Sequence, residues 1–246
     1  MPFLREPIVS IIIPCFNEEQ GIPHLAAQLD PVIRELQQKY ALELIFVDDG
    51  STDRTNALLH HYFDKKKNAK IIRHAINKNL GAALRTGFQH ASGAYIAALD
   101  SDCTYEPKIL LTLLERLNEG TDIVTVSPYH PLGKIENVPG WRIFLSKGSS
   151  LLYKHLLGSG IYTHGAMVRV YKREVLENVH SERNDFLYVS EILVKALLKG
   201  YKVTEVPATL RVRQFGASKM KLARTIKSHL GLMGRIILYK MFKREL

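Results

Sequence analysis

The stretch GAYIAALDSDCTYEP, residues 93–107, indicates the fold class, because an apolar run ends in it at two aspartates one residue apart. Residues 94–99 are apolar throughout, as in a strand buried on both faces. Asp100 and Asp102 follow, and their spacing lets both side chains point the same way. The pair has two interpretations. It is either a polar turn with a helix cap or a site for Mg²⁺ or Mn²⁺ on a diphosphate, since Mg²⁺ binds one or two carboxylates together with phosphate oxygens.

Similar short apolar runs occur on both sides of this stretch and alternate with helical patterns. The predicted strands of the first half are residues 8–13, 43–51, 69–74, 94–99 and 121–127, with helices over 18–40, from 52, over 79–91 and before 121. The second half predicts a loop over 127–140, helices over 141–157 and 187–199, strands over 165–171 and 201–207, and a helical tail from 218. This alternation predicts an α/β fold, a mostly parallel central sheet with helices on both faces.

Three predicted strands end in polar segments: PCFNEE (14–19), DDGSTD (48–53) and DSDCTYEP (100–107). Ligands of open parallel sheets bind beyond the carboxyl ends of the strands, so these segments are expected at one edge. Asp48 either shapes a turn or accepts hydrogen bonds from a nucleobase or a ribose. Arg85, inside a predicted helix, is either solvated or faces a diphosphate.

Composition limits the class of protein. The chain has 246 residues, 46% of them hydrophobic, which is enough for one large domain. Its two cysteines do not resemble a disulfide framework, and no signal peptide or long apolar run is visible, so a cytoplasmic protein is expected. The net charge is +10, with eight Lys and Arg against one acid from residue 219 onward. This charge favours an anionic membrane surface over nucleic acid, because no aromatic stacking platform accompanies it.

Four segments taken together resemble a known family. VSIIIPCFNEE (9–19), ELIFVDDGSTDRT (43–55), NKNLGAALRTGF (77–88) and residues 93–107 are similar to the nucleotide-sugar half of family 2 glycosyltransferases, which have the GT-A (Rossmann-like) fold. The resemblance implies that Asp100 and Asp102 are catalytic and hold Mg²⁺ or Mn²⁺. It assigns donor nucleotide binding to Pro14, Phe16, Glu18, Asp48, Arg85 and Asp100.

The second half resembles the polyprenyl-phosphate branch of that family, which includes the dolichyl-phosphate mannose synthases. The similar segments are WRIFLSKGSSLLY (141–153), residues 181–207, which contain no adjacent Glu-Asp pair, and RQFGASK (213–219). A lipid phosphate is already anionic near neutral pH, so it needs cations to orient it more than a base. The resemblance implies contacts with the acceptor phosphate or the diphosphate for Arg142, Ser146, Arg213, Ser218 and Lys219. Glu191 either binds sugar hydroxyls or pairs with a neighbouring cation, and His164 either contacts the sugar or is structural.

The implied reaction is inverting transfer of one sugar from GDP-mannose or a UDP-sugar to a polyprenyl phosphate at the cytosolic face of a membrane. One alternative has the same fold and transfers sugar to a glycolipid or glycan hydroxyl, with Glu191 or Asp185 as the base. Another is a membrane-associated sugar-nucleotide binder without catalysis. The expected domains are a GT-A domain over 1–220, with a donor half over about 1–127 and an acceptor half over about 128–220, and an amphipathic helix over 221–246.

The basic tail carries apolar residues at helical spacing. Leu222, Ile226, Leu230, Met233 and Ile237 fall on one face of a helix. This face either packs on the core or lies in the membrane interface with the cations on anionic headgroups. The second interpretation predicts peripheral attachment to the cytosolic face. A partner subunit with transmembrane helices is a further possibility.

Overall fold

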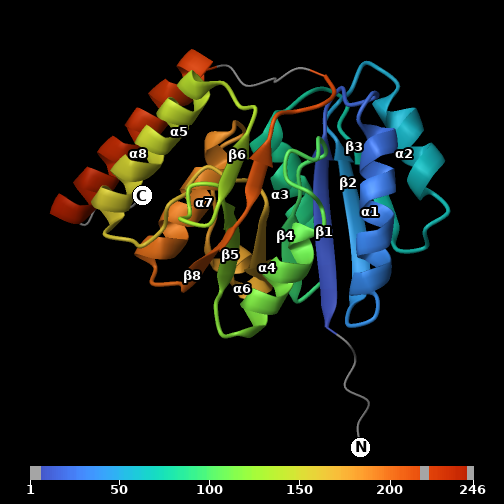
Figure 1. Cartoon of the computed structure of the whole chain (residues 1–246), viewed down its shortest axis with the longest axis horizontal. Coiled ribbons are helices and arrows are strands. Elements are labelled where there is room, and N and C mark those ends of the chain that lie inside the picture. Colours follow the sequence, from blue (N-terminus) through green and yellow to red (C-terminus); the bar gives the residue numbers. More distant parts are fainter. Residues whose placement is uncertain (1–6, 217–221, 243–246) are drawn as a thin grey trace, which may run out of the picture.

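A seven-stranded sheet runs through the computed structural model, which describes residues 7–216 and 222–242 (Figure 1). The strand order is β3-β2-β1-β4-β7-β5-β8. Its strands are β1 (Ile8–Cys15), β2 (Ala41–Asp48), β3 (Ala69–Arg73), β4 (Tyr95–Ala98), β5 (Ile123–Ser127), β7 (Arg169–Lys172) and β8 (Val203–Pro207). All neighbouring pairs are parallel except those of β7, which is antiparallel to both β4 and β5. The predicted mostly parallel sheet is confirmed.

Helices cover both faces of this sheet. The helices of the described residues are α1 (Ile22–Leu36), α2 (Thr55–Phe63), α3 (Leu80–His90), α4 (Ile109–Asn118), α5 (Gly140–Leu157), α6 (Arg173–Asn178), α7 (Leu187–Leu198) and α8 (Leu222–Phe242), of which α5 and α8 lie beside the sheet. Successive residues of β1 point to opposite faces, so Ile11 and Ile13 pack with α1, α2 and α4, while Ile12 packs with α3 and α7. Strands buried on both faces explain the unbroken apolar runs of the sequence.

Small residues bring α3 close to the sheet. A Cβ on Gly87 would lie 2.3 Å from Cγ2 of Ile12, so glycine at this position lets the helix pack directly on β1. The predicted helix over 79–91 is therefore held close to β1 and β2, two of the strands that end in acidic segments.

A further layer forms beside the sheet, where α5 and α8 lie side by side (Figure 1). Its small core joins α5, α7 and α8 and consists of Tyr153, Leu187, Val194, Leu232, Met233 and Ile236. Within the described ranges, no helix is long and apolar enough to cross a bilayer.

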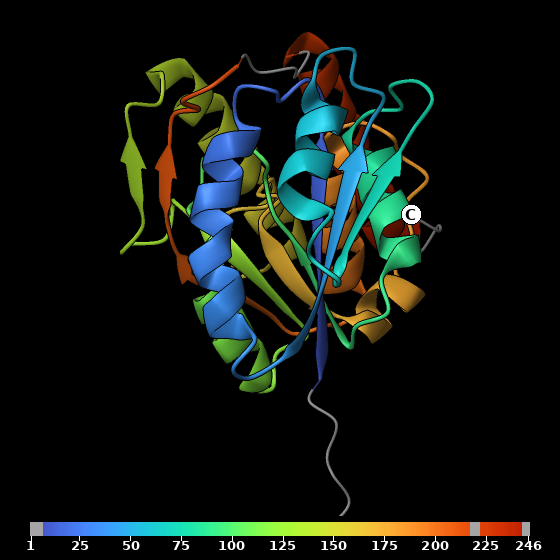
Figure 2. The ribbon, with the colours of Figure 1, turned by 90° about the vertical axis from the view of Figure 1, so that its right-hand side faces the viewer.

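A separate two-stranded sheet, β6 (Lys134–Glu136) with β9 (Thr209–Arg211), stands apart from the main sheet (Figure 2). The prediction of a loop over the whole of 127–140 was therefore wrong for residues 134–136. β6 is only three residues long, and its partner β9 is remote in sequence, so no local pattern indicates the pairing.

Candidate functional site

Three acidic side chains follow neighbouring strands and lie at one edge of the sheet. β1 pairs with β2 and with β4, and Cys15 at the end of β1 is in register with Asp48 at the end of β2. Glu18 follows β1, and Asp102 follows β4. The parallel direction of these strands brings all three carboxylates to the carboxyl edge.

The loop after β1 is fastened to the loop after β2. Asn17 has a φ of 53°, a left-handed conformation that asparagine tolerates better than most residues. Its N–H donates to Ser51 Oγ at 3.0 Å, and its Oδ1 accepts from the N–H of Thr52 at 2.8 Å. The N–H of Glu18 donates to Thr55 Oγ1 at 2.7 Å, which fixes the buried Glu18 beside the strand end. Pro14 is buried in the strand one residue before its end, and Phe16 begins the loop half-buried.

Asp48 and Asp49 have different surroundings. Asp48 is fully buried, its Oδ1 accepts from the N–H of Ser51 at 2.9 Å, and its Oδ2 lies 3.3 Å from Nε of Arg73. Asp49 fixes the loop before α3, because it accepts from the His74 ring at 2.7 Å and from the N–H of Lys78 at 2.9 Å. Asp49 is therefore structural, and Asp48 is the member of the pair at the strand end.

The loop with Asp100 and Asp102 has an unusual backbone. Cys103 has a φ of 54°, which is uncommon for a residue other than glycine or asparagine. This turn lets the N–H of Thr104 donate to Asp102 Oδ1 at 3.1 Å. Burial and the neighbouring Asp102 carboxylate raise the pKa of Asp100 well above its usual value. The two carboxylates are close enough to repel each other, and a cation beside them relieves this repulsion.

Arg213 supplies such a cation. Its Nε donates to Asp102 Oδ2 at 2.9 Å, and its Nη2 lies 2.8 Å from the same oxygen. Nη2 also lies 3.0 Å from Oε1 of Glu18. One guanidinium thus joins the carboxylates that follow β1 and β4.

The oxygen-rich cluster fits a divalent ion that phosphate helps to hold. Among the described residues, no group of three or more His, Cys, Asp and Glu side chains forms a metal site by itself. Mg²⁺ characteristically takes one or two carboxylates and completes its shell with water and phosphate oxygens. Asp102 and Glu18 already hold one cation, the Arg213 guanidinium, so the position is suited to positive charge. Asp102 and Asp100 would hold Mg²⁺ or Mn²⁺, and the ion would neutralise a diphosphate.

The Arg85 guanidinium binds oxygen atoms of a loop of the protein, whereas the resemblance implied a contact with the donor nucleotide. Its Nη1 donates to the carbonyl oxygens of Ser181 and Arg183, both at 3.1 Å, and its Nη2 donates to Asn184 Oδ1 at 2.6 Å. The structure therefore places Arg85 as a clamp between α3 and the loop before α7.

The residues assigned to the acceptor phosphate lie on two elements. Arg142 and Ser146 are exposed, one turn apart on α5, and the Arg142 guanidinium lies 5.2 Å from the ring centre of Trp141. Burial raises the pKa of the half-buried Tyr129 phenol, and the Ser146 hydroxyl opposes this rise. Arg213 lies on the segment after β9, with the carboxylates. Ser218 and Lys219 fall outside the described residues.

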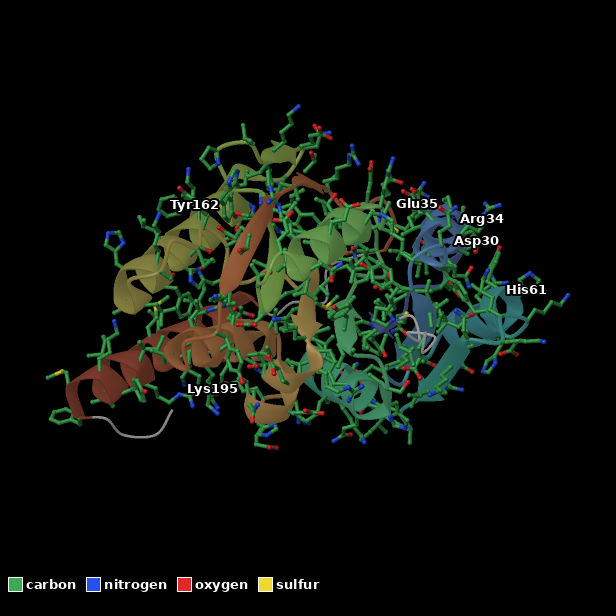
Figure 3. All side chains as sticks on the ribbon, turned by 90° about the horizontal axis from the view of Figure 1, so that it is seen from below. Asp30, Arg34, Glu35, His61, Tyr162 and Lys195 are labelled. Carbon is green, nitrogen blue, oxygen red and sulfur yellow. The ribbon has the colours of Figure 1, made fainter. Side chains whose placement is uncertain are left out.

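Glu191 has three cationic partners. Its carboxylate lies 3.2 Å from Arg183, from Lys195 and from Arg235 of α8, and it is almost completely buried. Burial alone would raise the pKa of Glu191, but Arg235 and Lys195 hold it below its usual value. Figure 3 shows Lys195 on α7 beside α8. Of the two interpretations of Glu191, the structure favours ion pairing.

His164 lies in the core, 1% exposed and stacked on Tyr153 of α5 with ring centres 5.3 Å apart. Burial and the nearby Arg169 lower the pKa of His164 to about 3, so its ring is neutral. The structure favours a structural role over a contact with the sugar.

Sequence reasoning missed two features of this site. Arg73 beside Asp48 could have been found, because it ends the strand next to β2. The pairing of Arg213 with Glu18 and Asp102 carries no local signal, since these three residues are far apart in the sequence.

Proteins similar in sequence to this chain are glycosyltransferases, in agreement with this geometry. Residues 10–179 match the model of the family described as glycosyl transferase family 2. The chain is 33% identical to a dolichol-phosphate mannosyltransferase of Pyrococcus furiosus, over 93% of this chain and 63% of that protein. It is 31% identical to a polyprenol monophosphomannose synthase of Mycolicibacterium smegmatis, over 85% of this chain and 80% of that protein. An undecaprenyl-phosphate 4-deoxy-4-formamido-L-arabinose transferase of Salmonella choleraesuis is 30% identical over 89% of this chain and 64% of its own length.

The fold also matches solved structures. Glucosyl-3-phosphoglycerate synthase of Mycobacterium tuberculosis, in complex with Mn²⁺, UDP and glucosyl-3-phosphoglycerate, superimposes with a TM-score of 0.67 at 20% identity. The match covers 94% of this chain and 79% of that one. The central sheet is thus that of a GT-A glycosyltransferase.

Proposed function

The chain belongs to glycosyltransferase family 2, and we propose that it transfers one sugar from a nucleoside diphosphate sugar to a polyprenyl phosphate, with inversion. The observation that carries the proposal is the convergence of Glu18, Asp48 and Asp102 at the ends of three neighbouring parallel strands. In this proposal Asp48 and Glu18 frame the nucleoside, and Asp100 and Asp102 hold Mg²⁺ or Mn²⁺ against the diphosphate. Mannose is the first candidate sugar, because two of the relatives are named for it.

A phosphate acceptor agrees with the state of the acids in the second half. A hydroxyl acceptor would need a base, and Glu191 and Asp185 were the candidates. Glu191 pairs with three cations, and two of them, Arg235 and Lys195, lower its pKa, which makes it a weaker base. Asp185 accepts from Ser228 Oγ and from the N–H of Leu187, both at 3.2 Å. These contacts support an acceptor that is already anionic, and Arg142 and Arg213 are the proposed cations for it.

Attachment to a membrane is supported by the layer of α5 and α8. Neither helix contains an Asp or a Glu, and together they expose Trp141, Phe144, Leu151, Leu152, Ile226, Leu230, Ile237, Leu238, Met241 and Phe242. Their exposed cations are Arg142, Lys147, Arg224, Lys227 and Lys240. Apolar side chains among cations are typical of helices in the interface of an anionic membrane. We propose that this layer, with the helix of the expected 221–246 segment as one half, attaches the GT-A domain peripherally to the cytosolic face. No contact of the described chain bears on a transmembrane partner subunit.

A donor and acceptor screen tests the reaction. The purified chain is given labelled GDP-mannose or UDP-sugars, Mn²⁺, and either a polyprenyl phosphate or the corresponding polyprenol. We expect label in the organic phase only with the phosphate, and release of that label by mild acid. Product from the polyprenol, or product that resists mild acid, would instead indicate a hydroxyl acceptor. Binding of donor without any product would indicate the non-catalytic sugar-nucleotide binder.

A further inference from the structure

The segment after β9 lies against the carboxylates of Glu18 and Asp102. Contacts hold this segment in place on both sides of Arg213. Before it, the N–H of Arg211 donates to the Thr104 carbonyl at 3.0 Å, and the Arg211 guanidinium pairs with Glu106 and Glu136. After it, the Phe215 ring lies 5.7 Å from the ring of His24 on α1. The contacts of Arg211 and Phe215 therefore hold the segment that places Arg213 beside these carboxylates.

We propose that Arg213 is an exchangeable counter-ion of the metal site: it holds Asp102 and Glu18 together, a divalent ion at Asp102 displaces it, and the released guanidinium then binds a phosphate group in the site. This inference rests on the proposed function, because it takes Asp102 as a ligand of Mg²⁺ or Mn²⁺.

Competition follows from the occupancy of the Asp102 oxygens. Oδ2 accepts both contacts from Arg213, at 2.9 and 2.8 Å, and Oδ1 accepts the N–H of Thr104 at 3.1 Å. Mg²⁺ bonds to a carboxylate oxygen at about 2.0–2.1 Å and repels a guanidinium a few ångströms away. An ion bound at Oδ2 therefore requires that Arg213 leave this oxygen.

The displaced guanidinium has a suitable new partner. A metal ion at Asp102 accompanies a diphosphate, and the acceptor brings a phosphate to the same place. The planar fork of arginine forms paired hydrogen bonds with phosphate as readily as with carboxylate. Because Arg211 and Phe215 keep the segment in place, Arg213 needs only a change of side-chain conformation to reach a phosphate beside the metal. Binding of the metal ion and the donor would therefore release the Arg213 guanidinium, which could then bind a phosphate.

Metal binding alone tests the first half of the proposal. Mn²⁺ is titrated into the full chain without nucleotide, and the free ion is measured by electron paramagnetic resonance. We expect Arg213→Ala to bind Mn²⁺ about tenfold more tightly than the wild type, because a site that is open only part of the time shows a correspondingly weaker apparent affinity. Arg213→Lys keeps the charge but lacks the fork that joins both carboxylates, so its affinity should lie between the two.

A matched control separates competition from the general effect of charge. Arg54→Ala removes one positive charge near the same strand end, where Arg54 lies 3.5 Å from Glu19. We expect its Mn²⁺ affinity to equal that of the wild type. Equal tightening in Arg54→Ala and Arg213→Ala, or Arg213→Lys equal to the wild type, would overturn the competition.

Phosphate binding tests the second half. With Mn²⁺ saturating, GDP or UDP is titrated in one arm and farnesyl phosphate in the other. We expect Arg213→Ala to weaken one of them about tenfold, a typical loss for a charge-assisted hydrogen bond at a phosphate. The arm that weakens identifies the donor diphosphate or the acceptor phosphate as the new partner. Unchanged binding in both arms would overturn the release onto phosphate.

Asp102→Asn distinguishes failure of this inference from failure of the proposed function. If the wild type and Asp102→Asn bind Mn²⁺ equally, the metal site itself is wrong and the exchange falls with it. If Mn²⁺ binding depends on Asp102 while Arg213→Ala binds no more tightly than the wild type, the metal site stands and only the exchange is wrong.

Discussion

Glu43 on β2 joins three separate segments of the chain through one buried carboxylate. It accepts from Ser10 Oγ at 2.7 Å, from Lys70 Nζ at 2.6 Å and from the N–H of Ser92 at 2.8 Å. Burial alone would raise the pKa of Glu43, but the hydrogen bonds from Lys70, Ser10 and Ser92 outweigh it, and the pKa lies below its usual value. The ionised form is therefore the one that stabilises the fold.

Glu43→Gln should lower the free energy of unfolding at pH 7 by about 1–3 kcal/mol, the usual cost of weakening hydrogen bonds to a buried charge. The contribution of Glu43 is complete above the unfolded pKa of about 4.3 and is lost as the pH falls through the lower folded pKa. The difference between the variant and the wild type should therefore shrink below that range. Urea unfolding at neutral and acidic pH measures it. Glu115→Gln, at an exposed pair with Lys39, is the control and should change stability by less than about 0.5 kcal/mol.

Asp102→Asn should reduce turnover at least about a hundredfold, on the scale of losing one electrostatic contact in a transition state. The side chain keeps its volume but loses the charge that a metal ion requires. Initial rates with saturating donor and acceptor measure the loss, and circular dichroism checks the fold. Asp30→Asn, at a surface pair with Lys66, should keep the wild-type rate. A wild-type rate in Asp102→Asn would contradict its role at the metal.

The sequence could predict which carboxylates gather, but not every partner that they take. Glu18, Asp48 and Asp102 follow parallel strands, and this topology alone brings them to one edge. Arg213 was expected at a phosphate and lies on two carboxylates. Both are anions that a guanidinium binds well, and nothing local in the sequence chooses between them. Arg85 likewise contacts carbonyl groups of a loop about a hundred residues away in the sequence. A short-range sequence pattern cannot predict a contact between residues so far apart.

At the scale of single elements, α8 has two apolar stripes. Periodicity selected the face of Leu222, Ile226, Leu230, Met233 and Ile237. Of the members whose side chains are described, only Met233 is buried, and Ile226, Leu230 and Ile237 are 39, 61 and 44% exposed. The stripe that packs contains Leu232 and Ile236, both fully buried against α5 and α7. A helix with apolar residues on two adjoining stripes does not reveal by spacing alone which one meets the core.

The two stripes predict opposite outcomes for one substitution. Leu232→Ala should cost about 2–5 kcal/mol of stability, as for a large side chain removed from a core. Leu230→Ala should cost less than about 0.5 kcal/mol, since this side chain is mostly exposed. Thermal or urea unfolding of both variants measures the difference. Equal losses would mean that α8 does not pack in this orientation.

The same packing changes what a shortened chain should do. Cutting the chain after Met220 would expose the inner faces of α5 and α7, including Tyr153 and Val194. The loss of α8 would also remove Arg235, which pairs with Glu191. The shortened chain should therefore be less stable than the full chain. Substitutions on the exposed stripe are the cleaner test of membrane attachment.

The exposed surface of α5 and α8 predicts that the protein binds reversibly to vesicles. Exposed apolar side chains would be partly buried in the interface, and each cation near an anionic leaflet adds about 1 kcal/mol. Co-sedimentation with anionic vesicles should be weakened, not abolished, by high salt, because screening leaves the apolar contribution.

Paired variants locate that surface. Phe144→Glu combined with Leu230→Glu should release the protein from anionic vesicles, because each puts an acid on the proposed membrane face. Ile76→Glu combined with Leu132→Glu is the matched control, since these side chains are 69 and 75% exposed but lie outside both helices. Release by the control as well, or retention of the variant at Phe144 and Leu230, would place the membrane contact elsewhere.

The antiparallel strand β7 has a consequence for how the chain must be made. It pairs with β4 on one side and with β5 on the other, so the expected donor half over 1–127 contributes two strands that only a later segment can join. Until Lys172 has left the ribosome, β4 and β5 each present an unpaired edge, the feature of a sheet most prone to aggregation. The nascent chain therefore joins β4 to β5 only after β7, which belongs to its second half, has been synthesised. A gene divided between the halves would therefore yield two aggregation-prone fragments rather than two independently folding domains.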